Sequence, residues 1–156
     1  MPAAIRAYDF VGAHDGAIDQ LGANVLTAQQ QERVLGTEIP LIAVVDDDAG
    51  MRQSLEGLVR SLGYRAALFE SAEHFLAAPE ALSSCCVISD LQMSGMSGIE
   101  LAHSLGERLK GRVILISAFL DERVRILADE AGVRCFLRKP FDGERLIGCI
   151  EAALAG

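Results

Sequence analysis

The stretch Leu41-Ile42-Ala43-Val44-Val45-Asp46-Asp47-Asp48 decides the fold of this 156-residue chain. Its apolar half predicts a short strand that is buried on both faces, as strands in parallel sheets are. Its acidic half predicts that the strand ends where side chains reach water. A strand of this kind requires helices above and below it, so we expect the following residues to form a covering helix.

The same unit recurs along the rest of the chain. Apolar runs predict four more strands, and apolar residues at helical spacing predict the helices between them. The further strands are expected at 64–69, 85–89, 112–117 and 133–137, and the helices at 49–62, 71–79, 99–109, 121–131 and 142–154. Alternating strands and helices imply parallel strands joined by right-handed crossovers. The sequence therefore predicts an α/β fold, a doubly wound five-stranded parallel sheet with five helices.

Residues 1–39 have a different character from the rest of the chain. They contain scattered glycines, a polar run at 29–33 and only a weak helical pattern from Ile18 to Leu35. Pro40 favours an extended Ile39 and ends this segment. We predict an N-terminal extension over 1–39, helical or disordered, that precedes a folded domain over 40–156.

Composition restricts the classes of partner. Asp and Glu total 22 against 14 Lys and Arg, which gives a net charge of -8 and disfavours binding to nucleic acid or to anionic lipid. No apolar run approaches the roughly 18 residues that a membrane span needs, and the first residues do not resemble a signal peptide. We therefore expect a cytoplasmic protein. Its four cysteines lack a C-x-x-C pair, so a zinc site is disfavoured and buried reduced thiols are expected.

Reactive side chains follow several of the predicted strands. Asp46 and Asp47 follow the first strand, Asp90 the third, Ser117 ends the fourth, and Lys139 follows the fifth. Ligands of open α/β sheets bind at the carboxyl ends of the strands, so we expect these groups to meet at one edge. Each residue alone has an ordinary role, such as a helix cap or a surface polar group. Their joint occurrence favours a common site.

The chemistry of such a site follows from its charges. Several carboxylates that lie close together need a counter-charge, and their oxygens suit Mg²⁺. With the repulsion reduced, Asp90 could attack phosphorus and form an acyl phosphate. Lys139 could bind one phosphoryl oxygen as a point charge, and Ser117 could donate a hydrogen bond to another. The sequence predicts Mg²⁺-dependent phosphorylation of Asp90.

The chain resembles the response-regulator receiver domains of two-component signalling, closest to the FixJ-like kind. The resemblance covers about Leu41 to Leu154. It rests on Val44–Asp48, Ser89–Gly98, Ile114–Ala118 and Leu137–Phe141.

What the resemblance implies is specific. It implies a flavodoxin-like (CheY-like) sheet in the order 2-1-3-4-5. It assigns Mg²⁺ binding to Asp46, Asp47, Asp90 and the backbone carbonyl of Gln92, phosphate binding to Lys139 and Ser117, and switching to Ser117 and Phe136. It also implies a cis Lys139–Pro140 bond, and a phosphorelay in which a histidine kinase or phosphotransfer protein phosphorylates Asp90. By this resemblance the chain is no enzyme beyond Mg²⁺-dependent self-phosphorylation and dephosphorylation.

Two positions depart from the family pattern, and other functions stay open. Ser94 replaces a usual proline, which should loosen the loop after Asp90, and Phe136 lacks a hydroxyl. A phosphorylation-independent interaction domain is the main alternative. A Mg²⁺-dependent phosphohydrolase is disfavoured because such enzymes carry a second aspartate where Gln92 stands. Nothing resembling a helix-turn-helix follows, so we expect output through protein contact, which includes a homodimer; the alternative is an output domain that was trimmed.

Overall fold

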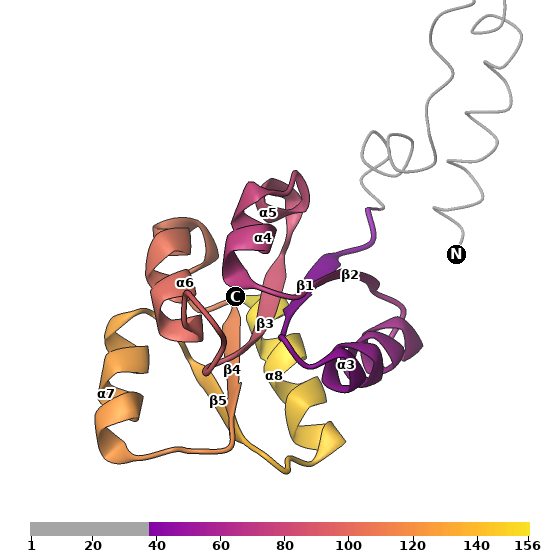
Figure 1. The fold of residues 1–156 in the computed structure, drawn as a ribbon. Coiled ribbons are helices and arrows are strands. Elements are labelled where there is room, and N and C mark those ends of the chain that lie inside the picture. The colour runs from indigo at the N-terminus through magenta and orange to yellow at the C-terminus, as the bar shows by residue number, and fades with distance from the viewer. Residues whose placement is uncertain (1–37) are drawn as a thin grey trace, which may run out of the picture. The chain divides into compact units, whose positions relative to one another are not determined.

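The computed structural model describes residues 38–156, which contain a five-stranded parallel sheet (Figure 1). Its order is β2-β1-β3-β4-β5, and every pairing is parallel. The strands are β1 (Leu41–Val45), β2 (Arg65–Phe69), β3 (Cys86–Asp90), β4 (Val113–Ser117) and β5 (Cys135–Arg138). The predicted fold class and strand order are confirmed.

The helices match the prediction except in number. The described residues form α3 (Ala49–Ser61), α4 (Ala72–Ala77), α5 (Glu80–Ser83), α6 (Gly98–Leu105), α7 (Glu122–Glu130) and α8 (Gly143–Ala155). The sequence predicted five helices and missed α5, which is too short to show a helical period. The predicted helix at 99–109 is also shorter, because Gly106 leaves helical geometry at φ 57° and a 3₁₀ turn follows over Gly106–Leu109.

The helices cover both faces of the sheet (Figure 1). Apolar side chains of α3 and α8 pack on one face with Ile42, Val44, Ile88 and Ile116. Side chains of α4, α5, α6 and α7 pack on the other face. All residues of β1, β3 and β4 are buried. This double burial explains why these strands are nearly continuous apolar runs, and it fixes the polar residues at their ends in place.

Short polar side chains fix where the helices begin. Asp48 accepts a hydrogen bond from the Met51 amide at the start of α3, and Asp121 does the same for α7. Ser97 and Glu100 form a reciprocal capping box at the start of α6. Asp48 therefore acts as the N-cap of α3.

The predicted extension over 1–39 lies almost wholly outside the described residues. Its weak helix from Ile18 to Leu35 and its boundary with the folded domain therefore stay predictions. Within 38–156, every helix falls short of the length and apolar character that crossing a membrane requires.

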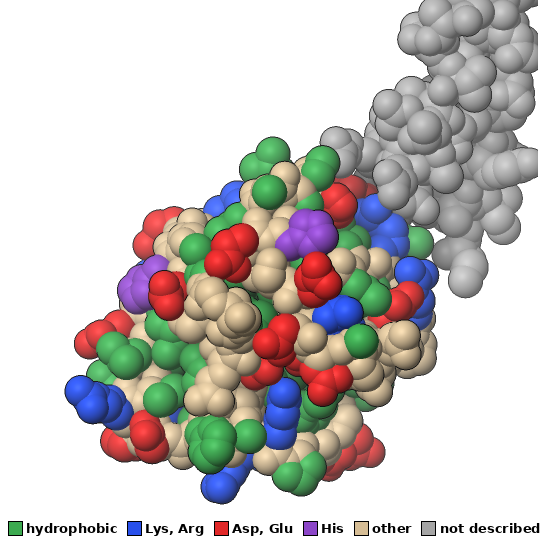
Figure 2. All heavy atoms as spheres, in the orientation of Figure 1, with side chains coloured by type: hydrophobic (Ala, Val, Ile, Leu, Met, Phe, Trp, Pro, Cys, Tyr) green, Lys and Arg blue, Asp and Glu red, His purple; other side chains and the backbone are tan. Residues whose placement is uncertain are grey.

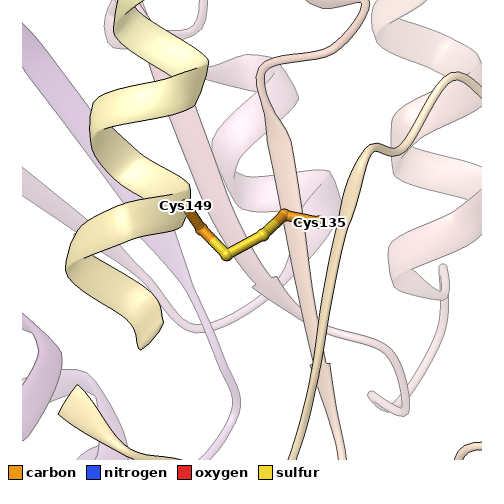
Figure 3. The surroundings of a disulfide bond; sticks show 2 residues. All are labelled: Cys135 and Cys149. Atoms are coloured by element: carbon orange, nitrogen blue, oxygen red, sulfur yellow. A yellow bond between two sulfur atoms is a disulfide. The ribbon is translucent and has the colours of Figure 1, made fainter. Parts of the chain in front are cut away.

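Two of the four cysteines are bonded to each other. Cys135 of β5 and Cys149 of α8 form a disulfide (Figure 3). The prediction of reduced thiols is wrong for this pair, while Cys85 and Cys86 are free. The two bonded residues are 14 apart in sequence, and only the packing of α8 beside β5 brings them together. Sequence spacing therefore carried no signal of the bond.

Candidate functional site

Three carboxylates converge where β1 and β3 end. Carboxylate oxygens of Asp46, Asp47 and Asp90 all lie within 4.8 Å of one another. Asp46 and Asp47 follow β1, and Asp90 is the last residue of β3, the neighbouring strand. In Figure 2, acidic side chains gather near the middle of the face shown, with basic side chains beside them. The carboxyl edge of the sheet thus holds the acidic cluster that the sequence predicted.

The surroundings of Asp46 disfavour its charged form. Its side chain is 1% exposed, and burial is the largest influence raising its pKa above the ordinary value of 3.8. The charges of Asp90 and Asp47 raise the pKa further, whereas a hydrogen bond from the Asp48 amide and the charge of Lys139 lower it. Burial and the two acidic neighbours therefore disfavour the charged form of Asp46.

Lys139 supplies one positive charge. Its ammonium nitrogen lies 3.4 Å from Oδ2 of Asp90 and 3.8 Å from Oδ2 of Asp46. The Lys139 amide also donates to the Ser117 carbonyl at 2.8 Å, which joins this residue to the end of β4. The predicted cis Lys139–Pro140 bond is confirmed.

The donor set suits a hard divalent cation. The side-chain oxygens of three carboxylates face one another within 4.8 Å, and oxygen-only ligands of this kind are those that Mg²⁺ prefers. One ammonium group against three carboxylates leaves an excess of negative charge that a divalent ion would remove. The position of the Gln92 carbonyl as a fourth ligand stays a prediction. The Gln92 amide donates to Oδ1 of Asp90 at 3.4 Å.

The two proposed switch residues lie on the same face of adjacent strands. Phe136 of β5 is in register with Leu115, two residues before the buried Ser117 of β4. Alternate residues of a strand share a face, so Phe136 and Ser117 are diagonal neighbours. The Phe119 amide donates to the Ser117 hydroxyl oxygen at 3.0 Å. The half-buried ring packs against the core beneath α6 and α7.

Gly98 allows the loop after Asp90 to return against β3. A Cβ at this position would lie 2.6 Å from the Asp90 carbonyl oxygen and 2.7 Å from Leu115 Cδ2. Its amide donates to the Leu91 carbonyl at 2.9 Å. The N-terminus of α6 can therefore lie directly against the end of β3 only if residue 98 has no side chain.

Two contacts that position the site were missed in the sequence. Arg52 of α3 donates from Nη1 to the Asp46 carbonyl at 2.7 Å. Glu73 of α4 accepts a hydrogen bond from the Met96 amide at 3.0 Å, within the loop that follows Asp90. Arg52 lies one helical turn beyond the cap Asp48, so its placement could have been found. Glu73 lies 23 residues from its partner, and no local pattern indicates the contact.

Comparison with known protein families identifies the family of this chain. The family described as the response regulator receiver domain matches residues 42–151. The chain belongs to this family. Receiver domains are modules of two-component response regulators, in which a phosphoacceptor role is typical. The family resemblance predicted from the sequence is confirmed.

Curated relatives agree with the assignment of a receiver domain. The transcriptional regulatory protein FixJ of Bradyrhizobium diazoefficiens is 39% identical over 118 residues, which cover 72% of this chain and 56% of the relative. The transcriptional regulatory protein TdiR of Thauera aromatica is 37% identical over 115 residues, which cover 73% and 51%. The chain thus spans about half the length of the curated relatives it matches.

A solved structure agrees as well. The crystal structure titled FixJ-N superposes with a TM-score of 0.65 at 32% identity and covers 76% of this chain and 95% of that chain. The receiver domain of the present chain therefore has the flavodoxin-like architecture of its family, with the site at the carboxyl edge of the sheet.

Proposed function

We propose that Asp90 accepts a phosphoryl group in a Mg²⁺-dependent reaction, and that the donor is a histidine kinase or a phosphotransfer protein. The observation that carries the proposal is the convergence of Asp46, Asp47 and Asp90 within 4.8 Å, with Lys139 3.4 Å from Asp90. Together these groups provide a nucleophile, ligands for a divalent ion and a cation for an incoming anion.

The transfer step uses the Asp90 carboxylate as nucleophile. One of its oxygens forms a bond to phosphorus while the bond from phosphorus to the donor's imidazole nitrogen breaks. The electron pair of the broken bond stays on the imidazole, which takes up a proton. The product is an acyl phosphate on Asp90.

Charge stabilisation comes from two sources. Lys139 lies beside Asp90 and can bind a phosphoryl oxygen as the transferred group arrives. Mg²⁺, held by Asp46, Asp47, Asp90 and the Gln92 carbonyl, would neutralise negative charge on the phosphoryl oxygens. Burial and its acidic neighbours disfavour the charged form of Asp46, and a cation bound to its carboxylate would offset both effects.

Signal transmission follows from Ser117 and Phe136. The Ser117 hydroxyl lies at the end of β4, where it could donate a hydrogen bond to the phosphoryl group. In the structure it accepts from the Phe119 amide, so moving toward the phosphate would release that loop. Phe136, diagonal to Ser117 across β4 and β5, would then turn inward. This is a shift between two packings of one fold.

The partners form the remaining part of the proposal. The phosphoryl donor is a histidine kinase or phosphotransfer protein in the cytoplasm, and the output passes through protein contact, which includes a second copy of the chain. The net charge of -8 disfavours direct contact with nucleic acid or anionic membrane by this chain.

Intact-mass spectrometry tests the phosphoryl transfer. The chain is incubated with a small phosphodonor and Mg²⁺, and we expect a gain of about 80 Da for one phosphoryl group. Asp90→Asn should abolish the gain, as should chelation of Mg²⁺. Asp129→Asn makes the same chemical change on the exposed surface of α7 and should leave the gain unchanged.

The alternative function gives a different result. A phosphorylation-independent interaction domain would show no mass gain with any donor, even with Mg²⁺ present and the fold intact. A gain that survives in Asp90→Asn would place the phosphoryl group elsewhere and would also contradict the proposal.

A further inference from the structure

The disulfide lies on the outermost strand of the sheet, β5, and not at the carboxyl ends of the strands, where the acidic cluster lies. Among the strands of residues 38–156, β5 is an edge strand that pairs with β4 alone, and Cys149 belongs to the helix α8. The Cα atoms of Cys135 and Cys149 lie 6.0 Å apart, within the range of about 4.4–6.8 Å that disulfides span. The separation of the two Cα atoms is therefore one that a disulfide can bridge.

Small molecules in solution can reach this pair. Both cysteines are half-buried rather than enclosed. They line a surface hollow of about 620 Å³, which also contacts Arg125, Arg134 and Arg145. A disulfide in such a position is open to thiolate attack, because thiol–disulfide exchange depends on access to the sulfur atoms.

The other two cysteines are free, and they differ from each other in burial. Burial raises the pKa of the Cys86 thiol to about 12, so this group stays protonated and unreactive. Cys85 precedes Cys86 in the chain and is also free. Cys85 is half-buried, so the choice of Cys135 and Cys149 as the redox site rests on the disulfide that joins them.

We propose that Cys135 and Cys149 form a reversible redox site, a dithiol that low-molecular-weight disulfides oxidise and that thiols reduce. In the cytoplasm, which we proposed above as the location, a disulfide is usually transient and redox-sensing. The surface formed by β5 and α8 would then differ between the oxidised and the reduced protein.

The exchange proceeds in two balanced steps. A thiolate of the pair attacks one sulfur of the small disulfide, forms a mixed disulfide and expels one small thiolate. The second cysteine, as thiolate, attacks the protein sulfur of the mixed disulfide and expels the other small thiolate. Two protein thiols lose two electrons and two protons, and the small disulfide gains the two electrons to become two thiols after protonation.

The structural consequence falls on the edge strand. In the oxidised form β5 is held by β4 on one side and is covalently tied to α8. In the reduced form the tie to α8 consists of packing alone. Oxidation should therefore slow local opening of Cys135–Arg138, the residues of β5.

The test uses the full chain in glutathione buffers that range from reduced to oxidised. After acid quenching, alkylation and digestion, peptides that contain Cys135 and Cys149 should be linked at the oxidised end. The intact chain should lose about 2 Da on oxidation. The same redox midpoint should be reached from both directions. Amides of β5 should exchange with solvent at least about tenfold more slowly in the oxidised chain.

Variants locate the reaction. Cys135→Ser and Cys149→Ser should each abolish the linked peptide and leave the remaining cysteine as a mixed disulfide with glutathione. Cys85→Ser is the matched control and should behave as the unmodified chain does. The proposal is overturned if no linked peptide forms in the most oxidising buffer, or if excess dithiothreitol cannot reduce it in the folded chain. Neither readout requires phosphorylation, so failure here is distinct from failure of the proposed function.

Discussion

Lys139 and Asp90 form an ion pair across two strands that are not neighbours in the sheet. Asp90 ends β3, Lys139 follows β5, and β4 lies between them. Their ammonium nitrogen and carboxylate oxygen are 3.4 Å apart. The pair can form because parallel strands end at the same edge, and because the Lys139 amide is bonded to the Ser117 carbonyl of β4 at 2.8 Å.

Removing the ammonium group should slow phosphorylation. We expect Lys139→Ala to lower the rate of transfer from a small phosphodonor by about 10²-fold, since one charge-stabilising donor is lost. The rate is measured as the growth of the phosphorylated species by intact mass. Lys110→Ala removes an ammonium group that pairs only on the surface, with Glu107, and should change nothing. A rate for Lys139→Ala within roughly twofold of the unmodified chain would exclude Lys139 from transfer.

The raised pKa of Asp46 predicts how stability depends on pH without metal. A carboxyl group whose pKa is higher in the folded state binds more protons there than when unfolded, so its ionisation destabilises the fold as pH rises above 3.8. In a chelator, Asp46→Asn should therefore be more stable than the unmodified chain at neutral pH. This difference should shrink as the pH falls toward 4, as measured by urea unfolding.

Adding Mg²⁺ should reverse this order. An ion that binds the folded state alone stabilises it by about 2.7 kcal/mol at a concentration of 100 times its Kd. The unmodified chain should gain stability with Mg²⁺, and Asp46→Asn should gain little. Equal gains in both proteins would place the ion elsewhere.

Glu73 should hold the loop that follows Asp90. Its carboxylate accepts from the Met96 amide, and this hydrogen bond is the largest cause of its lowered pKa. Because the pKa is lowered, the contribution of this contact is fully present above the ordinary value of 4.5 and is lost as the pH falls through the lower pKa of the folded state. The family resemblance leads us to expect a proline where this loop has Ser94, so we expect the Glu73 contact to supply part of the restraint that a proline would give.

Amide hydrogen exchange measures the effect. Glu73→Ala should speed exchange of the Met96 amide at neutral pH, and Glu73→Gln, which keeps an acceptor, should restore part of the protection. Glu70→Ala removes an exposed carboxylate just before α4 and serves as the control. Unchanged exchange at Met96 in Glu73→Ala would mean that the loop is held by other contacts.

The sequence predicted what depends on local pattern. The apolar run Leu41–Val45 and its counterparts predict the strands. The rule that parallel strands end at one edge of the sheet predicts that Asp46, Asp90 and Lys139 lie together. Contacts between distant elements were not predictable in this way. Glu73 and Met96 meet only because α4 packs beside the loop, and Cys135 and Cys149 meet only because α8 packs on β5.

Short elements also could not be predicted from the sequence. The helix α5 has four residues, which is about one turn and offers no period to detect. Predicted strand boundaries differ from the observed ones by one or two residues, because the ends of an apolar run do not mark the first and last hydrogen bonds of a strand. The expected start at Val133, for example, became Cys135.

Gly98 gives the sharpest test of how packing supports the site. A methyl group at residue 98 would overlap the Asp90 carbonyl oxygen at 2.6 Å and Leu115 at 2.7 Å, and both belong to buried strands that cannot move freely. We expect Gly98→Ala to lower the free energy of unfolding by about 1–3 kcal/mol. It should also weaken Mg²⁺ binding, because relief of the overlap displaces Asp90.

Gly57 is the matched control for this substitution. It lies on the exposed side of α3, and a Cβ there would have nothing within 4 Å. Gly57→Ala should stabilise the chain by about 0.5–1 kcal/mol, because alanine favours the helix. The free energies of unfolding of both variants are to be measured by urea unfolding in the presence of a chelator. Mg²⁺ binding is then measured by titration. If both substitutions stabilised the chain equally, α6 would not be packed tightly against the end of β3. The proposed effect of residue 98 on Asp90 and on Mg²⁺ binding would then be wrong.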